Sequence, residues 1–478
     1  MTLTTAGRRA RIKQGSAVKQ GGAVILLTMS LGVLIAQIDT TVVNLAVKEI
    51  GASLDAGVTS LQWVVDAYNL VYASLLLTAG TLADLYGRRR IFALGIALFA
   101  LGSLVCGLAS NAPELIAGRA VAGLGAALEI PTSLAILTVS YQDTRKRTQA
   151  LGVWASCNGL ALAIGPTLGG ALMESAGWRS IFLLIIPICV LALVLTATSI
   201  PESKDPNGRR LDAPGQALAI AGLGALAVAV IEGPQWGWGS IGSVAAFVAS
   251  GLSLTLFVLR QKGAEGALMP LAIFKNRVFS ASLGIAAAMT FGVYAMLFLT
   301  PLYLQAVRRD SALQAALALL PMSLTFVIVS QLSGKIANAY GPRLPMTLGM
   351  AMMGTGLFML ALVPLGNSLL LVETALMALG CGLGLNTGPV NAVAVANVSA
   401  ARSGMASGLL NTARMVGATF GVAVLGAIFA IFAGRGGGFA AGLPPAFIGG
   451  GIAEMLGAAA AFTFIRRDSL YPVASRSS

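Results

Sequence analysis

The sequence predicts an all-α membrane protein built from two related helical bundles. Hydrophobic residues make up 56% of the 478-residue chain and charged residues only 10%, whereas soluble domains carry roughly 25% charge. Apolar runs of about 20 residues, the length that crosses a hydrocarbon core, recur from end to end. A short loop, GTLADLYGRR at residues 80–89, returns 254 residues later as GKIANAYGPR at residues 334–343. Each copy lies between two apolar runs, which is typical of secondary transporters with internal repeats.

The distribution of basic residues predicts how the chain crosses the membrane. Fourteen apolar segments can be placed between residues 23 and 465, and an even number puts both termini on one side. Of the 31 Lys and Arg residues, 24 fall on the side of the termini, 5 on the other side, and Arg119 and Arg414 within segments. Since cytoplasmic loops are enriched in Lys and Arg, we expect 14 transmembrane helices with both termini cytoplasmic.

The spacing of the two loop copies predicts the internal arrangement. Six spans with their loops occupy roughly 190 residues at this density, so a separation of 254 leaves room for two additional spans, which match Ala213 to Leu259. We therefore divide the chain into a basic cytoplasmic leader (1–22), an N-terminal six-helix bundle (23–200), an inserted helix pair with flanking loops (201–265), a C-terminal six-helix bundle (266–465) and a cytoplasmic tail (466–478). The leader precedes an apolar run without a convincing cleavage site, so we expect an uncleaved first span.

Several function classes find no support in the composition. The chain contains no histidine, which excludes a histidine metal site and a Ser-His-Asp triad. The four cysteines lie in apolar runs without ligand spacing, which favours packing over metal binding. The net charge of +13 is dispersed through loops, as topology requires, and does not indicate nucleic-acid binding. We expect no enzyme activity, no catalytic residues, no metal and no cofactor.

The loop at residues 80–89 predicts a conformational latch. Gly80 and Gly87 permit close helix approach and a tight reversal. Asp84 can bond the basic cluster, which includes Arg88 and Arg89, or the positive end of a neighbouring helix. Such a bond can hold one conformation and release in another. The alternative is that the arginines only set topology.

The fifth span predicts a bent helix that packs closely against its neighbours. Its sequence, GLALAIGPTLGG at residues 159–170, contains Gly159, Gly165, Pro166, Gly169 and Gly170. Proline removes a backbone hydrogen bond and kinks the helix, and glycines let other helices approach. The alternative is a bent span without a special role.

Ionisable residues within the spans are the candidates for proton coupling. Arg119 lies in the fourth span, about 6–8 Å from its outer end at 1.5 Å per residue, and Asp39 and Asp66 lie at similar or slightly greater depth. Glu129 lies about 15 Å deeper than Arg119. Charges in hydrocarbon are costly and usually face a partner or a cavity. A static salt bridge between Asp39 and Arg119 is the alternative, although buried pairs stabilise poorly.

These motifs together resemble the major facilitator superfamily and, within it, the fourteen-span drug:proton antiporter family. The loop at 80–89 is similar to the signature between the second and third helices of the superfamily, and residues 159–170 to the signature of its antiporters. Residues 119–127 resemble its basic motif, and DTTVVN at 39–44 and WVVDAY at 63–68 resemble the first two helices of the drug:proton family. The second loop copy departs from the signature at Asn338, and Glu129 replaces an expected apolar residue.

The resemblance implies the major facilitator fold and a proton-coupled antiporter. Such a protein exports small amphipathic drugs, antibiotics or lipophilic cations by alternating access, as quaternary-ammonium, multidrug and methylenomycin resistance exporters do. In that case residues 159–170 shape the gate between the halves. Its partners are a small-molecule substrate, protons and the lipid bilayer, and it works as a monomer in the bacterial cytoplasmic membrane. The alternative is an exporter of an endogenous metabolite, such as a siderophore, amino acid or sugar.

Overall fold

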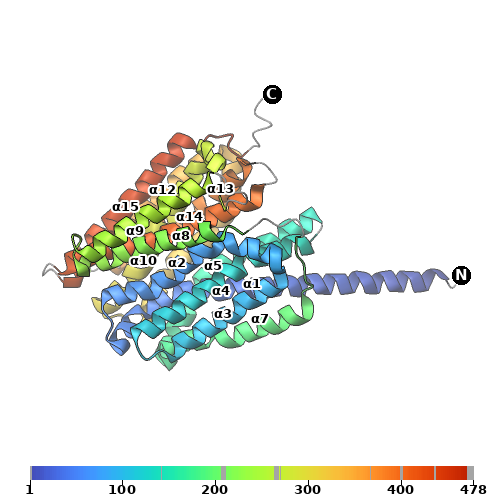
Figure 1. Ribbon diagram of the computed structural model, residues 1–478, viewed down its shortest axis with the longest axis horizontal. Helices are drawn as coiled ribbons and strands as arrows, with labels where there is room; N and C mark the ends of the chain where they lie inside the picture. Colours follow the sequence, from blue (N-terminus) through green and yellow to red (C-terminus); the bar gives the residue numbers. More distant parts are fainter. Residues whose placement is uncertain are drawn as a thin grey trace.

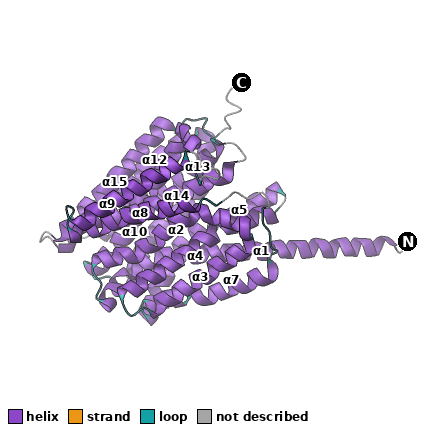
Figure 2. Cartoon of the chain, viewed as in Figure 1, coloured by secondary structure: helices purple, strands orange, loops and turns teal. Residues whose placement is uncertain are grey.

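The protein is helical throughout the part that its computed structural model describes (Figure 2). That part comprises residues 3–141, 143–205, 211–262, 268–269, 271–366, 368–398, 402–434 and 438–470. The side chains of residues 3–21, which belong to the predicted basic leader, and the end of the predicted tail lie outside the described residues.

The N-terminal half is a bundle in which α4 packs against α1, α2 and α3, and α5 and α7 pack against α1. Helix α6 is short because α6 and α7 belong to one span, which is interrupted at Leu184. Pro187 lacks the N–H that would bond to Leu183, which explains the interruption. The helices of this half are α1 (Leu3–Leu54), α2 (Val58–Tyr86), α3 (Arg88–Leu108), α4 (Ala112–Ser140), α5 (Thr144–Ala176), α6 (Arg179–Leu183) and α7 (Ile185–Ser199).

The C-terminal half is a second bundle with equivalent pairings, such as α12 with α13 and α11 with α13. A short 3₁₀ helix, η1, leads into it. Its elements are η1 (Leu271–Lys275), α10 (Arg277–Ala306), α11 (Ala312–Tyr340), α12 (Arg343–Gly366), α13 (Leu369–Ala396), α14 (Ser403–Phe432) and α15 (Gly438–Phe464).

Glycines at matching positions show that the two halves repeat one packing pattern. Gly95 and Gly102 of α3 lie where an added Cβ would meet backbone atoms of α4 at 2.5 to 2.9 Å. Gly349 and Gly356 of α12, each 254 residues later, bear the same relation to α13. Because any side chain there would push the helices apart, these glycines set the helix spacing in both halves.

The inserted pair, α8 (Ala213–Trp236) and α9 (Ile241–Gln261), forms a hairpin beside both halves (Figure 1). Its first helix packs against α2 of one half and α14 of the other. Asp212 closes the hairpin, because its carboxylate accepts hydrogen bonds from Arg260 at 2.7 Å and Gln261 at 2.9 Å. Gly215 N–H donates to the same carboxylate at the start of α8.

The two bundles converge at the end far from the termini and diverge at the end that carries them (Figure 1). At the converging end, Lys48 Nζ of α1 donates to the carbonyl oxygen of Gln305 in α10 at 2.7 Å. Gln305 in return donates to the carbonyl oxygen of Leu45 at 2.8 Å, and Gln62 of α2 donates to Val422 of α14. These reciprocal hydrogen bonds hold the halves together at this end.

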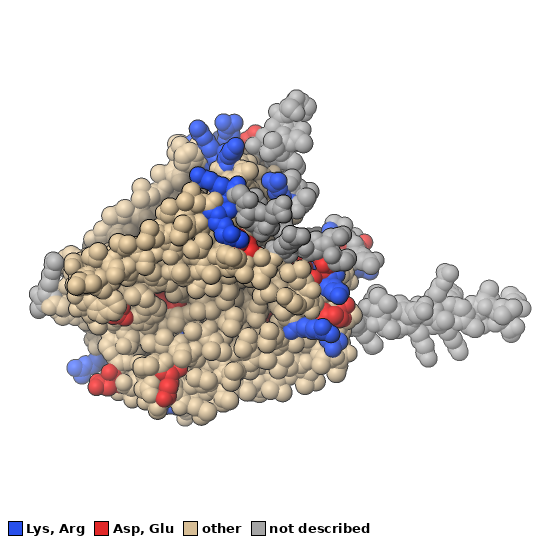
Figure 3. Space-filling view, in the orientation of Figure 1, with Lys and Arg blue, Asp and Glu red and all other residues tan. Residues whose placement is uncertain are grey.

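The exterior is suited to lipid, with charged side chains gathered toward the two ends of the molecule (Figure 3). In the described residues, thirteen helices are long and apolar enough to cross a membrane. The sequence predicts fourteen spans, and the additional one corresponds to α2. Gln62, Asp66 and Asn69 interrupt the apolar sequence of α2, and all three are buried inside the protein instead of facing lipid.

Candidate functional site

The central feature of the N-terminal half is a buried ion pair between α1 and α4. Arg119 Nη1 lies 2.5 Å from Asp39 Oδ2, and the two side chains are 2% and 1% exposed. Arg119 Nε donates to the carbonyl oxygen of Val64 in α2 at 3.0 Å, and its guanidinium lies 4.5 Å from the centroid of the Tyr68 ring. A single arginine therefore connects three helices, and the structure pairs Asp39 with Arg119, as in the alternative that the sequence leaves open.

Two further acids of this half, Asp66 and Glu129, are fully buried and differ from Asp39 in having no hydrogen-bond partner among the described residues. The second oxygen of Asp39 also has none. Buried polar groups are normally hydrogen-bonded, so orphaned carboxyl oxygens require an explanation. Because an unpaired carboxylate in a membrane interior is costly, the energetically accessible form of Asp66 and of Glu129, which have no cation beside them, is the neutral acid.

The charges of the bundle interior cannot balance without bound protons. Its three acids, Asp39, Asp66 and Glu129, share a single cation, Arg119, among the described residues. One carboxylate is neutralised by the guanidinium, and the other two acids need a proton each. The arrangement can thus hold and release protons when helix movements change the surroundings of the carboxyls.

The position of Glu129 is set by the glycines at the α3–α4 contact. A Cβ on Gly95 would lie 2.9 Å from the backbone nitrogen of Glu129, and one on Gly125 would lie 2.6 Å from the nitrogen of Phe99. In the C-terminal half, Gly349, Gly382 and Asn386 repeat this arrangement.

Asn386 therefore occupies in α13 the place that Glu129 occupies in α4. It is equally buried, and its side-chain amide donates to the carbonyl oxygen of Gly382 at 3.1 Å. One half thus carries an ionisable carboxyl where the other carries a neutral amide. The repeated loop does not predict this correspondence, because the spacing of 254 residues that brings Gly95 onto Gly349 brings Glu129 onto Leu383, three residues before Asn386.

The predicted latch residues join the loop between α2 and α3 to the segment that follows α7. Arg88 forms an ion pair with Asp84 at 2.8 Å, and its backbone N–H donates to Ser203. Gly87 has φ +107°, a conformation that favours glycine, and the carboxylate of Glu202 packs against it. Gly80 differs from the close approach expected of it, because no atom lies within 4 Å of the position of its Cβ.

A carboxylate that our sequence analysis did not single out completes this loop. Glu202 accepts a hydrogen bond from the backbone N–H of Arg89 at 3.1 Å and lies 3.7 Å from the Arg90 guanidinium. It therefore sits at the start of α3, where the unpaired N–H groups of the helix attract an anion.

The glycines of α5 lie on two faces of the helix. Gly165 and Gly169 face α1, where Thr41 and Val42 occupy the space a side chain would need. Gly170 faces α11 of the other half, with an added Cβ only 2.9 Å from the Cα of Leu313, and Gly159 faces the same helix at Val327. Pro166 lies between these positions inside α5. This span therefore contacts its own bundle on one face and the opposite bundle on the other.

A line of polar contacts joins the inserted helix α8 to α2, and no local sequence pattern predicts it. Glu232 accepts a hydrogen bond from Trp63 Nε1 at 2.7 Å. Other links pair Gln235 with Thr59, and Gln216 with Thr78. The contact with α14 is apolar and includes Ala227, Ile231 and Ala423.

The C-terminal half has its own ionisable groups beside α10, the buried Glu454 and the half-buried Arg414. Glu454 of α15 is fully buried, and its carboxyl packs against Gly292. Arg414 of α14 donates to the carbonyl oxygen of Thr387 at 3.4 Å, and its own carbonyl accepts from Thr290. Within the described residues, no group of three or more Cys, Asp or Glu side chains is placed to hold a metal ion.

Two glycine-packed helical bundles around buried ionisable groups, within an apolar exterior, define a polytopic transporter. Residues 29–422 match the family model of the Major Facilitator Superfamily. The chain belongs to this superfamily and is a multi-pass transporter of the bacterial cell membrane.

Proteins similar to this chain include two bacterial resistance proteins. The "Multidrug resistance protein Stp" of Mycobacterium tuberculosis is 38% identical over 405 residues, which cover 85% of this chain and 75% of that protein. The "Methylenomycin A resistance protein" of Bacillus subtilis is 36% identical, over 88% of this chain and 90% of that protein. A solved structure, the "D-xylose-proton symporter", matches with a TM-score of 0.70 at 14% identity, over 94% of this chain and 99% of that chain. The structural match shows the shared fold.

Proposed function

We propose that the protein is a proton-coupled antiporter that exports small amphipathic drugs, antibiotics or lipophilic cations. The observation that carries this proposal is the set of three buried acids in the N-terminal half, of which only Asp39 is paired with an arginine, in a chain similar to named antibiotic-resistance proteins. One elementary charge moving through 100 mV supplies about 2.3 kcal/mol, which supports roughly a fifty-fold concentration ratio. A single proton is therefore sufficient to drive useful export of an uncharged drug, whereas exchange of one proton for a monovalent cation moves no net charge and draws on the pH gradient alone.

The proposed cycle assigns different roles to the acids. Asp39 is held by Arg119 in this conformation, whereas Asp66 and Glu129 carry protons. When the bundles rock, the α1–α4 and α2–α4 contacts change, so Arg119 and the acids exchange partners and a proton is released toward the cytoplasm. The glycines of α5 permit this rocking against α11, and the loop of Gly80, Asp84, Gly87, Arg88 and Arg89 latches one end state.

The proposal includes the membrane topology that the sequence predicts. The chain crosses the membrane fourteen times with both termini in the cytoplasm, and α8 and α9 are a pair inserted between two six-helix bundles. The end at which the bundles diverge then faces the cytoplasm, and the hydrogen bonds of Lys48 and Gln305 close the outer end. Reporter enzymes fused after α7 and after α9 test this, since both fusions should remain cytoplasmic.

Transport in inside-out membrane vesicles tests the function. Vesicles containing the protein and energised to an acidic interior should accumulate ethidium, and Asp39→Asn should abolish this uptake while the protein is still inserted. Replacing ethidium with siderophores, amino acids and sugars separates drug export from metabolite export. If Asp39→Asn transports ethidium with unchanged coupling to protons, the assigned role of the ion pair is wrong.

A further inference from the structure

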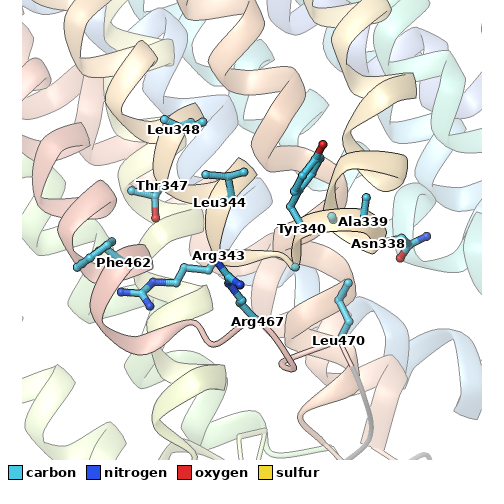
Figure 4. Close-up of a pocket in the computed structure, with 12 residues that line it drawn as sticks. Asn338, Ala339, Tyr340, Arg343, Leu344, Thr347, Leu348, Phe462, Arg467 and Leu470 are labelled. Carbon is cyan, nitrogen blue, oxygen red and sulfur yellow. The ribbon is translucent and has the colours of Figure 1, made fainter.

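A cavity of about 770 Å³ opens where α11 ends, α12 begins and the chain leaves α15 (Figure 4). It is far from the ion pair of the N-terminal half, and the second copy of the repeated loop, including Asn338, forms part of its wall. Arg343, Arg467 and Thr347 provide polar groups, and Leu344, Leu348 and Phe462 provide apolar ones. None of the described residues that line it is acidic, and Asp468, which follows Arg467, is not among them.

The cavity contains hydrogen-bond donors that lack acceptors. Figure 4 shows Arg343 reaching toward Phe462, with Arg467 beside it. The Arg343 guanidinium lies 3.9 Å from the centroid of the Phe462 ring, while its Nε is buried without a hydrogen-bond partner among the described residues. The Thr347 hydroxyl is also buried without a hydrogen-bond partner among the described residues. The N-terminal end of α12, with its unpaired backbone N–H groups, begins at Arg343.

The N-terminal half shows what belongs at the equivalent place. Gly87 and Gly341 are repeat equivalents, and both have positive φ, +107° and +82°. A Cβ on Gly87 would lie 2.7 Å from the carboxylate of Glu202, whereas one on Gly341 would lie 2.8 Å from the Cα of Arg467. One half therefore supplies its own anion at the start of the following helix. In the C-terminal half, Arg467 and the cavity lie at the start of α12 instead.

We propose that this cavity binds the phosphate group of an anionic phospholipid. Two arginines and a helix start match the charge and geometry of a phosphate, which arginine binds through charge-assisted hydrogen bonds. The side chains of Leu344, Leu348 and Phe462 are 43%, 49% and 58% exposed on the surface that faces lipid. They extend the site toward the bilayer and identify its occupant as a lipid instead of free phosphate. Basic pockets at the ends of membrane helices bind anionic headgroups in this way.

Lipid binding to the purified full-length protein tests this proposal independently of transport. Native mass spectrometry with added phosphatidylglycerol should show one lipid retained more tightly than phosphatidylcholine. The double variant Arg343→Gln/Arg467→Gln should lower the affinity of this site at least tenfold, because two charge-assisted hydrogen-bond donors are lost. Lys335→Gln removes an exposed charge from the same end of α11 outside the cavity, and should leave binding unchanged.

A further variant copies the N-terminal half. Arg467→Glu provides an internal carboxylate near the position that Glu202 occupies, so it should abolish phosphatidylglycerol binding without lowering the thermal unfolding temperature. Equal phosphatidylglycerol binding by the wild type and the double variant, both confirmed as folded, would overturn the proposal. Complete displacement of the lipid by inorganic phosphate at millimolar concentration would also overturn it, because it would show a site for free phosphate.

Discussion

Replacing Glu129 and Asp39 by their amides separates the two kinds of buried acid. Asp39 neutralises Arg119 across 2.5 Å with both side chains buried. Asp39→Asn leaves the guanidinium charge uncompensated, and breaking a buried pair in this way costs about 3–5 kcal/mol. Glu129 has no hydrogen-bond donor aimed at it and is neutral in our account. Glu129→Gln then exchanges one neutral group for another of equal size, so its cost should stay below about 1 kcal/mol.

Thermal unfolding of the purified variants in detergent measures these costs. Asp39→Asn should unfold at a clearly lower temperature than the wild type, and Glu129→Gln close to it. Adding Arg119→Gln to Asp39→Asn removes the uncompensated charge, so the double variant should recover part of the loss. Despite its stability, Glu129→Gln should lose one transported proton, which lowers the greatest drug gradient at 100 mV about fifty-fold. Equal destabilisation by the two amides would refute the distinction between a paired and a protonated acid.

Three further predictions concern packing and the inserted hairpin. Gly102→Ala places a Cβ 2.5 Å from the backbone of α4 and should destabilise the protein by about 1–3 kcal/mol in thermal unfolding, whereas Gly80→Ala, with open space around it, should not. Gly170→Ala should slow ethidium transport by separating α5 from α11, while Gly152→Ala on the same helix should transport normally. Burial raises the pKa of Asp212, but hydrogen bonds from Arg260, Gln261 and Gly215 outweigh it and bring the pKa below its usual value. The stabilisation that ionised Asp212 gives to the α8–α9 hairpin should therefore be complete above about pH 4. It should disappear as the pH falls through the lower pKa of the folded state. Proteolysis of the α7–α8 linker at graded pH measures this loss.

The sequence predicts best those features that lie along the chain. Apolar runs predict the helices, and the repeated loop predicts two related halves. The similar depth of Asp39 and Arg119 in different spans makes their pairing one of the alternatives that the sequence offers. Depth along a helix follows directly from residue number at 1.5 Å per residue, so it needs no knowledge of how the helices are rotated.

The features that the sequence did not reveal depend on helix rotation and on partners far away in the chain. Whether Glu129 is paired depends on which face of α4 meets α3, and this is fixed by close contacts at Gly95 and Gly125. The bond from Trp63 to Glu232 requires the inserted pair to lie along α2, which no local pattern encodes. The repeat spacing aligns Glu129 with Leu383, so its correspondence with Asn386 emerges only from the equivalent helix contacts at which both residues are buried.

Proton release by the purified protein is the most direct test of the central claim, that buried acids of the N-terminal half exchange protons for substrate. In weakly buffered detergent solution, adding ethidium to the wild type should release protons in proportion to the bound ligand. Asp39→Asn should release fewer or none while remaining folded. Ligand binding by the wild type without any change in proton content, across pH 6 to 8, would contradict the account.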